Sequence, residues 1–179
     1  VYKRQTLITD SDAGFMFSDP SPDGMTLSTN TTEGGILFKL SQPYSAQTAW
    51  SFPRDSQDRK FAPLDWSADG RQILGFFYAP GATDSVTALY NLDSEAYEMA
   101  PADVGGQGQS FLGTDHRLVW AEGSKVIVHD LRMGETRELL STAPDLAAWP
   151  MLGPDGKTLY FVQRSASADI HLLVAEDPS

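Results

Sequence analysis

Cysteine is absent from this chain of 179 residues, which excludes disulfides, thiol catalysis and thiolate metal sites. Long apolar runs are missing too, since no stretch approaches the ~20 consecutive apolar residues that a membrane-spanning helix needs. Basic residues are scarce: 13 Lys and Arg stand against 24 Asp and Glu, for a formal charge of −11. Phosphate backbones and anionic lipid repel such a domain, so we expect neither nucleic-acid binding nor membrane insertion by this segment.

An apolar periodicity of about 3.6 residues, the pattern of an amphipathic helix, is not sustained anywhere in the chain. What is present instead is an internal repeat. A short turn-like string returns at residues 20–24 (PSPDG), 66–70 (WSADG), 111–115 (FLGTD) and 152–156 (LGPDG). The last residues of successive copies are 46, 45 and 41 positions apart. These spacings are close to the ~40–45-residue period of a four-stranded propeller blade.

Each copy of the repeat is surrounded by short runs rich in β-branched and aromatic residues, which predict strands. The runs that directly follow the turn are 25–29, 72–77, 117–120 and 158–162. The next strand of each unit is expected at 35–40, 87–92, 125–130 and 169–174. A shorter outer strand is expected at 48–52, 96–99 and 136–140. The fourth unit is therefore expected to have one strand fewer than the others.

The Asp-Gly pair of the repeat has a mechanical reason. Glycine supplies the positive φ of a tight hairpin without steric cost, and aspartate caps its own turn. The turn therefore joins the innermost strand of a blade to the next strand. The innermost strand at 61–66 contains Pro63. Because proline cannot donate a hydrogen bond to the sheet, we expect Pro63 at a strand start or at a bulge.

These units, together with residues 153–161 (GPDGKTLYF), resemble the repeat of TolB-like and WD-repeat-like β-propellers over residues 6–174. The segment 132–173 is also similar to the C-terminal propellers of bacterial eukaryotic-like serine/threonine protein kinases. Those propellers often end in a blade of the form Ala-Asp-Ile-Trp-Leu-Leu, and here the string is ADIHLL, with His171 in place of tryptophan. The resemblance implies an all-β propeller of four-stranded antiparallel blades. Similar propellers follow winged-helix regulatory domains and occur in peptidase-like chains, so the parent protein stays open.

Four blades are expected, at about 13–56, 57–103, 104–143 and 144–179. Residues 6–12 resemble the outer strand of a preceding blade. Residues 1–5 (VYKRQ) match one reading frame of a transposon adapter used to prepare sequencing libraries, so we expect them to be a scar. The alternative is a natural basic strand end. Four blades can close on themselves, but we expect these four to belong to a larger ring of about six to eight blades.

Residues that could carry chemistry are few. No G-x-S-x-G nucleophile elbow is present, and the nearest string, 108–113 (GQSFLG), has the wrong spacing. His116, His129 and His171 fall at different points of the repeat and form no H-E-x-x-H pattern, so we expect structural or solvent-facing roles. The glycine run 105–108 (GGQG) lacks a Walker lysine and precedes a strand. It predicts an inter-blade loop rather than a phosphate cradle.

The aspartates Asp23, Asp69 and Asp155 are explained by the turns, and no D-x-[DN]-x-[DN]-G calcium loop occurs. A further acidic and basic cluster predicts a solvated loop with local ion pairs rather than a binding site: Asp55, Asp58 and Asp65 beside Arg54, Arg59 and Lys60.

All four tryptophans lie within or beside predicted strands: Trp50, Trp66, Trp120 and Trp149. Since successive blades pack face to face, large aromatic side chains are expected between them. Trp149 has a second interpretation, because it lies beside Pro150 near an innermost strand and could form an exposed recognition surface.

We therefore predict that this segment is not an enzyme and has no catalytic, cofactor-binding or metal-binding residues. The expected function is a non-enzymatic interaction or sensing module for a protein or peptide partner. Its expected context is the C-terminal part of a bacterial multidomain signalling protein such as a serine/threonine kinase. The sequence leaves the compartment open and favours an extracytoplasmic or periplasmic one. The alternatives are a standalone TolB-like envelope hub and the propeller of a prolyl-oligopeptidase-like or tricorn-like peptidase.

Overall fold

A computed structural model describes residues 16–41, 48–79, 81, 85–101, 104–113, 116–153, 157–165 and 170–176. The predictions for the adapter scar at 1–5, for a preceding strand at 6–12 and for the turn at Asp155 lie outside the described residues.

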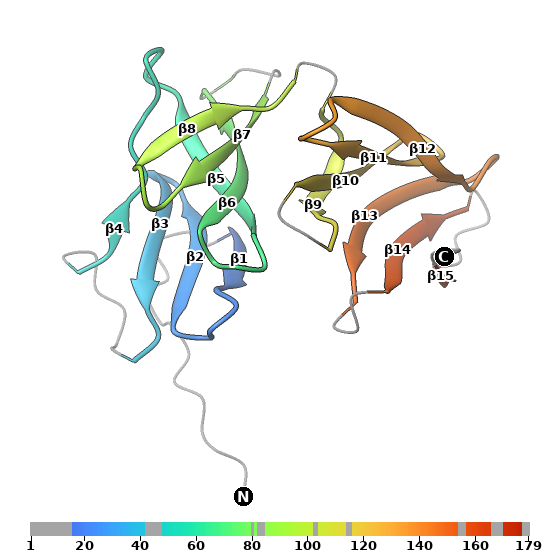
Figure 1. The fold of residues 1–179 in the computed structure, drawn as a ribbon, viewed down its shortest axis with the longest axis horizontal. Helices are drawn as coiled ribbons and strands as arrows, with labels where there is room; N and C mark the ends of the chain where they lie inside the picture. Colours follow the sequence, from blue (N-terminus) through green and yellow to red (C-terminus); the bar gives the residue numbers. More distant parts are fainter. Residues whose placement is uncertain are drawn as a thin grey trace, which may run out of the picture.

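The described chain forms four antiparallel sheets and contains no helix (Figure 1). The first sheet contains β1 (Met16–Pro20), β2 (Thr26–Thr31), β3 (Gly34–Lys39) and β4 (Trp50–Ser51). The second contains β5 (Lys60–Trp66), β6 (Gln72–Tyr78), β7 (Val86–Asn91) and β8 (Ala96–Met99). The third contains β9 (Gln107–Phe111), β10 (Arg117–Glu122), β11 (Lys125–Asp130) and β12 (Glu135–Ser141). The fourth contains β13 (Leu146–Leu152), β14 (Thr158–Arg164) and β15 (Ile170–Glu176).

Strands that are consecutive in sequence are neighbours in every sheet, which is the simple meander of a propeller blade. The all-β fold class and the three-stranded fourth sheet predicted from the repeat are both confirmed for the described residues. Within the same residues, no helix exists that could cross a bilayer.

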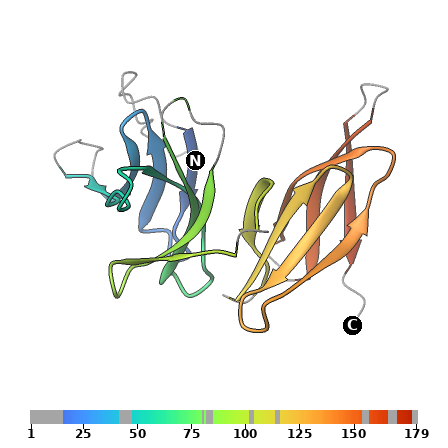
Figure 2. The ribbon, with the colours of Figure 1, turned by 90° about the horizontal axis from the view of Figure 1, so that it is seen from above.

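The four sheets follow one another in chain order, from the blue sheet at one end to the orange and red sheet at the other (Figures 1 and 2). The first strand of each sheet contacts the first strand of the next, so that β1, β5, β9 and β13 form one continuous row. We call this row the inner-strand row. Each of β5, β9 and β13 also contacts the second strand of the sheet before it. The sheets are therefore stacked like blades around the inner-strand row.

The repeated turn is built as the sequence predicts, with an additional serine. Gly24 and Gly70 have φ angles of +68° and +72°. Asp69 Oδ1 accepts hydrogen bonds from the Ser67 hydroxyl (2.8 Å) and from the Arg71 N–H (2.9 Å). The Ser67 hydroxyl oxygen in turn accepts the Gln72 N–H (2.8 Å). Because serine and aspartate satisfy the turn's backbone donors together, the motif closes the hairpin without outside partners.

Pro63 lies at a bulge, as expected for a residue without an N–H. The pairing of β5 with β6 changes register between Pro63 and Asp65. The extra residue re-aims the end of β5, so that Asp65 points toward the neighbouring blades rather than along the ladder.

Three apolar clusters fill the spaces between successive sheets. The cluster between the first and second sheets is aromatic and includes Phe52, Phe61, Phe77 and Tyr90. The cluster between the second and third sheets joins Leu74 and Leu89 to β-strand residues such as Leu118 and Trp120. The third cluster, between the last two sheets, is aliphatic apart from Phe161. Hydrophobic burial therefore stabilises the contacts between blades as well as each blade itself.

Candidate functional site

The three histidines do not come together. His116 lies in the turn before β10, and His171 lies on β15 opposite Gln163. His129 is buried on β11, and its Nδ1 lies 2.7 Å from the Thr136 hydroxyl. Among the residues that the structure describes, no group of three His, Cys, Asp or Glu side chains could hold a metal ion.

The glycine run forms part of an inter-blade loop and the start of β9, as predicted. Gly108 has a φ angle of +66°, and a Cβ there would overlap the backbone of Trp149 in the next blade. Glycine is required at this position because two inner strands approach closely. The run therefore needs no phosphate to explain it.

The predicted cluster of acidic and basic residues divides into two parts. Local ion pairs are present in the loop before β5, between Arg54 and Asp58 (3.2 Å) and between Arg59 and Asp55 (2.6 Å). The prediction was wrong on two points. The Asp55 side chain is only 6% exposed, so this part of the loop is not solvated. Asp65 lies outside the loop, near the far end of β5. An extended strand advances ~3.3 Å per residue, so Asp65 is well separated from the loop residues.

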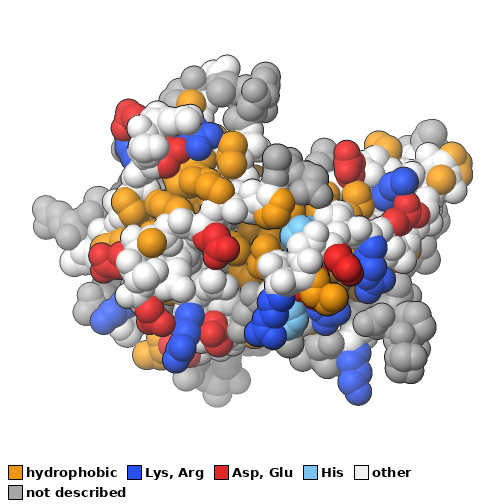
Figure 3. Space-filling view, turned by 45° about the horizontal axis from the view of Figure 1, so that its top comes forward, with side chains coloured by type: hydrophobic (Ala, Val, Ile, Leu, Met, Phe, Trp, Pro, Cys, Tyr) orange, Lys and Arg blue, Asp and Glu red, His pale blue; other side chains and the backbone are white. Residues whose placement is uncertain are grey.

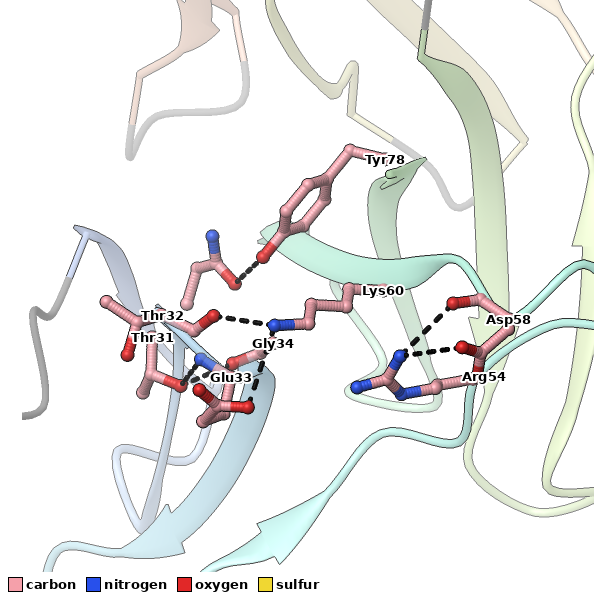
Figure 4. A network of polar contacts seen from close by, with 9 residues as sticks. Thr31, Thr32, Glu33, Gly34, Arg54, Asp58, Lys60 and Tyr78 are labelled. Carbon is pink, nitrogen blue, oxygen red and sulfur yellow. Dashed lines mark hydrogen bonds and ion pairs between the residues drawn. The ribbon is translucent and has the colours of Figure 1, made fainter. Parts of the chain in front are cut away.

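Lys60 links the first blade to the second at one end of the inner-strand row. Its Nζ donates to the Thr32 carbonyl (2.8 Å) and lies 3.6 Å from the Glu33 carboxylate (Figure 4). Thr32 and Glu33 form the turn between β2 and β3. This turn is also held by the Thr31 hydroxyl, which accepts the Glu33 N–H. The lysine side chain is only 12% exposed. These contacts satisfy the polar groups of a junction, which indicates a structural role.

Replacing Lys60 by methionine is expected to lower the free energy of unfolding by about 1–2 kcal/mol, because the buried ammonium group makes a charge-assisted hydrogen bond. Lys125→Met is the matched control. Its ion pair with Glu138 is half exposed, so its loss is expected to cost less than about 0.5 kcal/mol. Urea denaturation measures both values, and equal losses in the two variants would show that the Lys60 contact is not structural.

The tryptophans divide evenly between core and surface. Trp66 and Trp120 are buried between blades, as predicted, with exposed fractions of 8% and 1%. Trp50 is 40% exposed, although its ring contacts Phe52 and Tyr90 at the edge of the cluster between the first two blades. The core prediction was wrong for Trp149, which is 48% exposed. Trp50 lies on the short outer strand β4, which has no neighbour on its other side. Trp149 lies on the inner strand β13, where a bulge turns its side chain outward.

Two exposed aromatic side chains occupy equivalent strained positions in the inner-strand row. In each blade one turn residue donates its backbone N–H across the hairpin, and we call it the turn position: Ser21, Ser67, Leu112 and Gly153. Phe17 and Trp149 each lie four residues before a turn position, and their φ angles are +50° and +46°. Gly108 has the equivalent place on β9. Bulky residues are rare at positive φ, and each instance costs roughly 1–3 kcal/mol. The strain turns two aromatic rings outward, with Phe17 57% exposed.

The Trp149 ring is held in place by its neighbours. The Arg164 guanidinium lies 4.6 Å from the ring centroid, a cation–π distance. The next carbonyl, that of Pro150, accepts a hydrogen bond from the Ser110 hydroxyl on β9 (2.9 Å). The exposed ring therefore has a defined orientation before any partner arrives, which reduces the entropy lost on binding.

A pair of carboxyl groups, Asp19 and Asp65, lies further along the same row. Both are partly buried, and they are hydrogen-bonded to each other. Asp65 Oδ1 accepts the N–H of Trp66 (2.8 Å), and Asp65 Oδ2 accepts the N–H of Phe111 on β9 (2.7 Å). Asp65 therefore joins the inner strands of three blades.

Burial raises the pKa of Asp65 to about 7, against the opposing effect of the Phe111 N–H and with a further increase from the Asp19 charge. Burial also raises the pKa of Asp19. Two carboxyls in hydrogen-bond contact share one proton, because two ionised carboxylates side by side repel each other strongly.

Sequence reasoning missed this carboxyl pair, although a signal was present. Asp19 and Asp65 both stand two residues before the turn serine, in the strings Asp-Pro-Ser and Asp-Trp-Ser. Aligning the repeats shows the coincidence. Only the bulge in β5 and the close contact between β1 and β5 reveal that equivalent residues of neighbouring blades meet.

Similarity to solved structures defines the class of fold. The chain matches TolB from Acinetobacter baumannii with a TM-score of 0.73 and 17% identity, over 94% of this chain and 42% of that one. It matches a TolB protein from Agrobacterium tumefaciens with a TM-score of 0.74 and 14% identity, over 96% and 61%. An oligogalacturonate lyase in complex with manganese matches with a TM-score of 0.67 and 12% identity, over 91% and 51%.

At these identities the likeness establishes the fold alone: the sheets are blades of a TolB-like β-propeller. The chain spans about half the length of the structures that it matches. No family model matches the chain, and no curated protein sequence does.

Proposed function

We propose that this chain is a non-enzymatic interaction module, which binds a protein or peptide partner at the inner-strand row. The observation that supports this function is the pair of exposed aromatic side chains, Phe17 and Trp149, at strained positive φ angles. Both side chains are about half exposed, so their burial in the core is incomplete and offsets this strain only in part. Backbone strain of this kind concentrates at ligand-binding sites, where it fixes a side chain in advance.

The surface chemistry fits a protein or peptide partner. On the face shown in Figure 3, hydrophobic side chains gather over the middle of the molecule, with acidic and basic side chains around them. Aromatic rings with a polar surround are typical of the central part of protein interfaces. The net charge of −11 favours partners that carry basic groups.

The proposed context is the C-terminal part of a bacterial signalling protein such as a serine/threonine kinase, within a ring of about six to eight blades. The similarity of residues 132–173 to kinase-associated propellers supports this context. The nucleotide sequence upstream of the segment tests it. Kinase motifs there would support the proposal, a signal peptide leading directly into blades would favour a TolB-like envelope hub, and peptidase motifs would favour a peptidase propeller.

Absence of catalysis in this segment stays a prediction. One matched structure is a lyase and two are TolB proteins. A likeness at these identities does not transfer an activity in either direction.

Selection from a displayed peptide library tests the interaction function. The immobilised chain is expected to enrich a peptide family that binds with a micromolar dissociation constant. Trp149→Ala is expected to weaken binding at least ~10-fold, because aromatic anchors dominate the energetics of interfaces.

Trp50→Ala is the matched control for this experiment. Trp50 has a similar exposed fraction but lies on the outer strand β4, so its loss is expected to leave the affinity unchanged. Failure to enrich any peptide, or a peptide whose affinity does not respond to Trp149→Ala, would contradict the proposal.

A further inference from the structure

Two groups of polar contacts join the first two blades along the inner-strand row: the Lys60 contacts at one end and a group around the Asp19 and Asp65 carboxyls at the other. The Trp66 N–H donates to Asp65 Oδ1 (2.8 Å) and also faces the Asp19 carboxyl. In the opposite direction, the Trp66 indole N–H donates to the Asp19 carbonyl (3.1 Å) and to the Ser28 hydroxyl (3.0 Å). The hydrogen bond between the carboxyls lies in the middle of this group.

The equivalent places in the other blades contain no carboxyl group. Ser110 stands two residues before the turn position of the third blade, and Met151 does so in the fourth. The Ser110 hydroxyl reaches the next blade by donating to the Pro150 carbonyl. That bond is made by a neutral group, so its strength does not depend on pH in the neutral range. At these equivalent places, two carboxyl groups meet only between the first and second blades.

No cation among the described residues lowers the pKa of either carboxyl. The strands packed against β1 and β5 are β2, β3, β6 and β9, and among the described residues they carry one charged side chain, Lys39 at the end of β3. Lys60 lies at the opposite end of β5 and is engaged by Thr32 and Glu33. Tyr78 at the end of β6 donates to Asn30.

We propose that the contact between the first two blades is a proton-operated clamp: one proton shared by the Asp19 and Asp65 carboxyls holds β1 against β5, and loss of that proton loosens the contact. The bond from the Phe111 N–H to Asp65 survives the loss, since an ionised carboxylate accepts it more strongly. The clamp therefore opens the first blade selectively and leaves the second and third blades joined.

The direction of the pH dependence follows from linkage. The pKa of Asp65 is about 7 in the folded chain and about 4 in an unfolded chain. The folded state retains a proton that the unfolded state has lost between these two values. The contribution of the carboxyl pair to stability is therefore fully present below about pH 4. Above that pH the unfolding constant rises by up to ~10-fold per pH unit, until the pH reaches about 7.

Nuclear magnetic resonance of the 179-residue chain tests the clamp directly. Between pH 5 and pH 9, the Trp66 indole N–H and the Phe111 amide N–H are expected to shift together with a midpoint near pH 7. The Trp66 indole N–H is expected to exchange with solvent faster above the midpoint, and the Phe111 amide is expected to stay protected. Separate titration of the Asp19 and Asp65 carboxyl carbons, each near pH 4, would overturn the proposal.

Two variants distinguish the pair from other neutral titrations, which include those of histidine. In Asp19→Asn, an amide N–H replaces the shared proton permanently, so the neutral midpoint is expected to disappear and the stability at pH 8.5 to exceed that of the wild type. Asp93→Asn changes an exposed carboxylate and is expected to keep the wild-type response. An unchanged neutral midpoint at Trp66 in Asp19→Asn would overturn the proposal. The titration of the wild-type chain tests the proposal even where a variant fails to fold.

Discussion

Alanine in place of Gly35 is expected to lower the free energy of unfolding by about 3 kcal/mol. Gly35 lies on β3, at the point where β5 of the next blade crosses it. An added Cβ would lie 2.5 Å from Pro63 Cδ and 2.6 Å from the Phe61 carbonyl oxygen. Backbone and a proline ring cannot move aside without separating the blades, and overpacking of this kind costs roughly 1–3 kcal/mol or more.

Gly105→Ala is the control for this measurement, because no atom lies within 4 Å of its added Cβ. Urea denaturation at constant pH is expected to show a change of less than about 0.5 kcal/mol for the control. If the two variants lost equal stability, the first two blades would not be packed as closely as the structure describes.

Truncation of Phe61 to alanine is expected to cost about 3–5 kcal/mol, which is the range for a buried phenylalanine. Phe61 is 1% exposed and lies at the centre of the aromatic cluster between the first two blades. Its ring centroid is 5.0 Å from that of Phe52, 5.1 Å from that of Tyr97 and 5.5 Å from that of Phe77. The loss combines transfer free energy, a cavity and three aromatic pairs.

Met99→Ala is the matched control for Phe61→Ala. Met99 is 46% exposed at the end of β8, so its truncation is expected to change the free energy of unfolding by less than about 0.5 kcal/mol. A loss of less than about 1 kcal/mol in Phe61→Ala would mean that the aromatic cluster does not stabilise the contact between blades.

The features that sequence predicted well are local. The turn at Ser67–Gly70 needs only residues within the hairpin, and its glycine, aspartate and spacing identify it directly. The bulge at Pro63 follows from one missing N–H. Strand order follows from short connections, since consecutive strands become neighbours.

The features that sequence missed are contacts between blades. Asp65 meets Asp19 and the Phe111 N–H, which lie about one repeat away on either side. Composition therefore placed Asp65 with its sequence neighbours in a solvated loop. Trp149 was expected in the core because the strand pattern indicates which residues are apolar, but the pattern does not indicate that a bulge reverses the direction of one side chain.

The inner-strand row is the proposed binding surface for a partner. Amide and indole chemical shifts, recorded while a selected peptide is added to the 179-residue chain, test it most directly. Shifts are expected at Phe17, at the Trp149 indole and at neighbouring residues of β1 and β13. Shifts confined to Trp50, Met99 and the outer strands would contradict it and would move the binding surface to the opposite side of the blades.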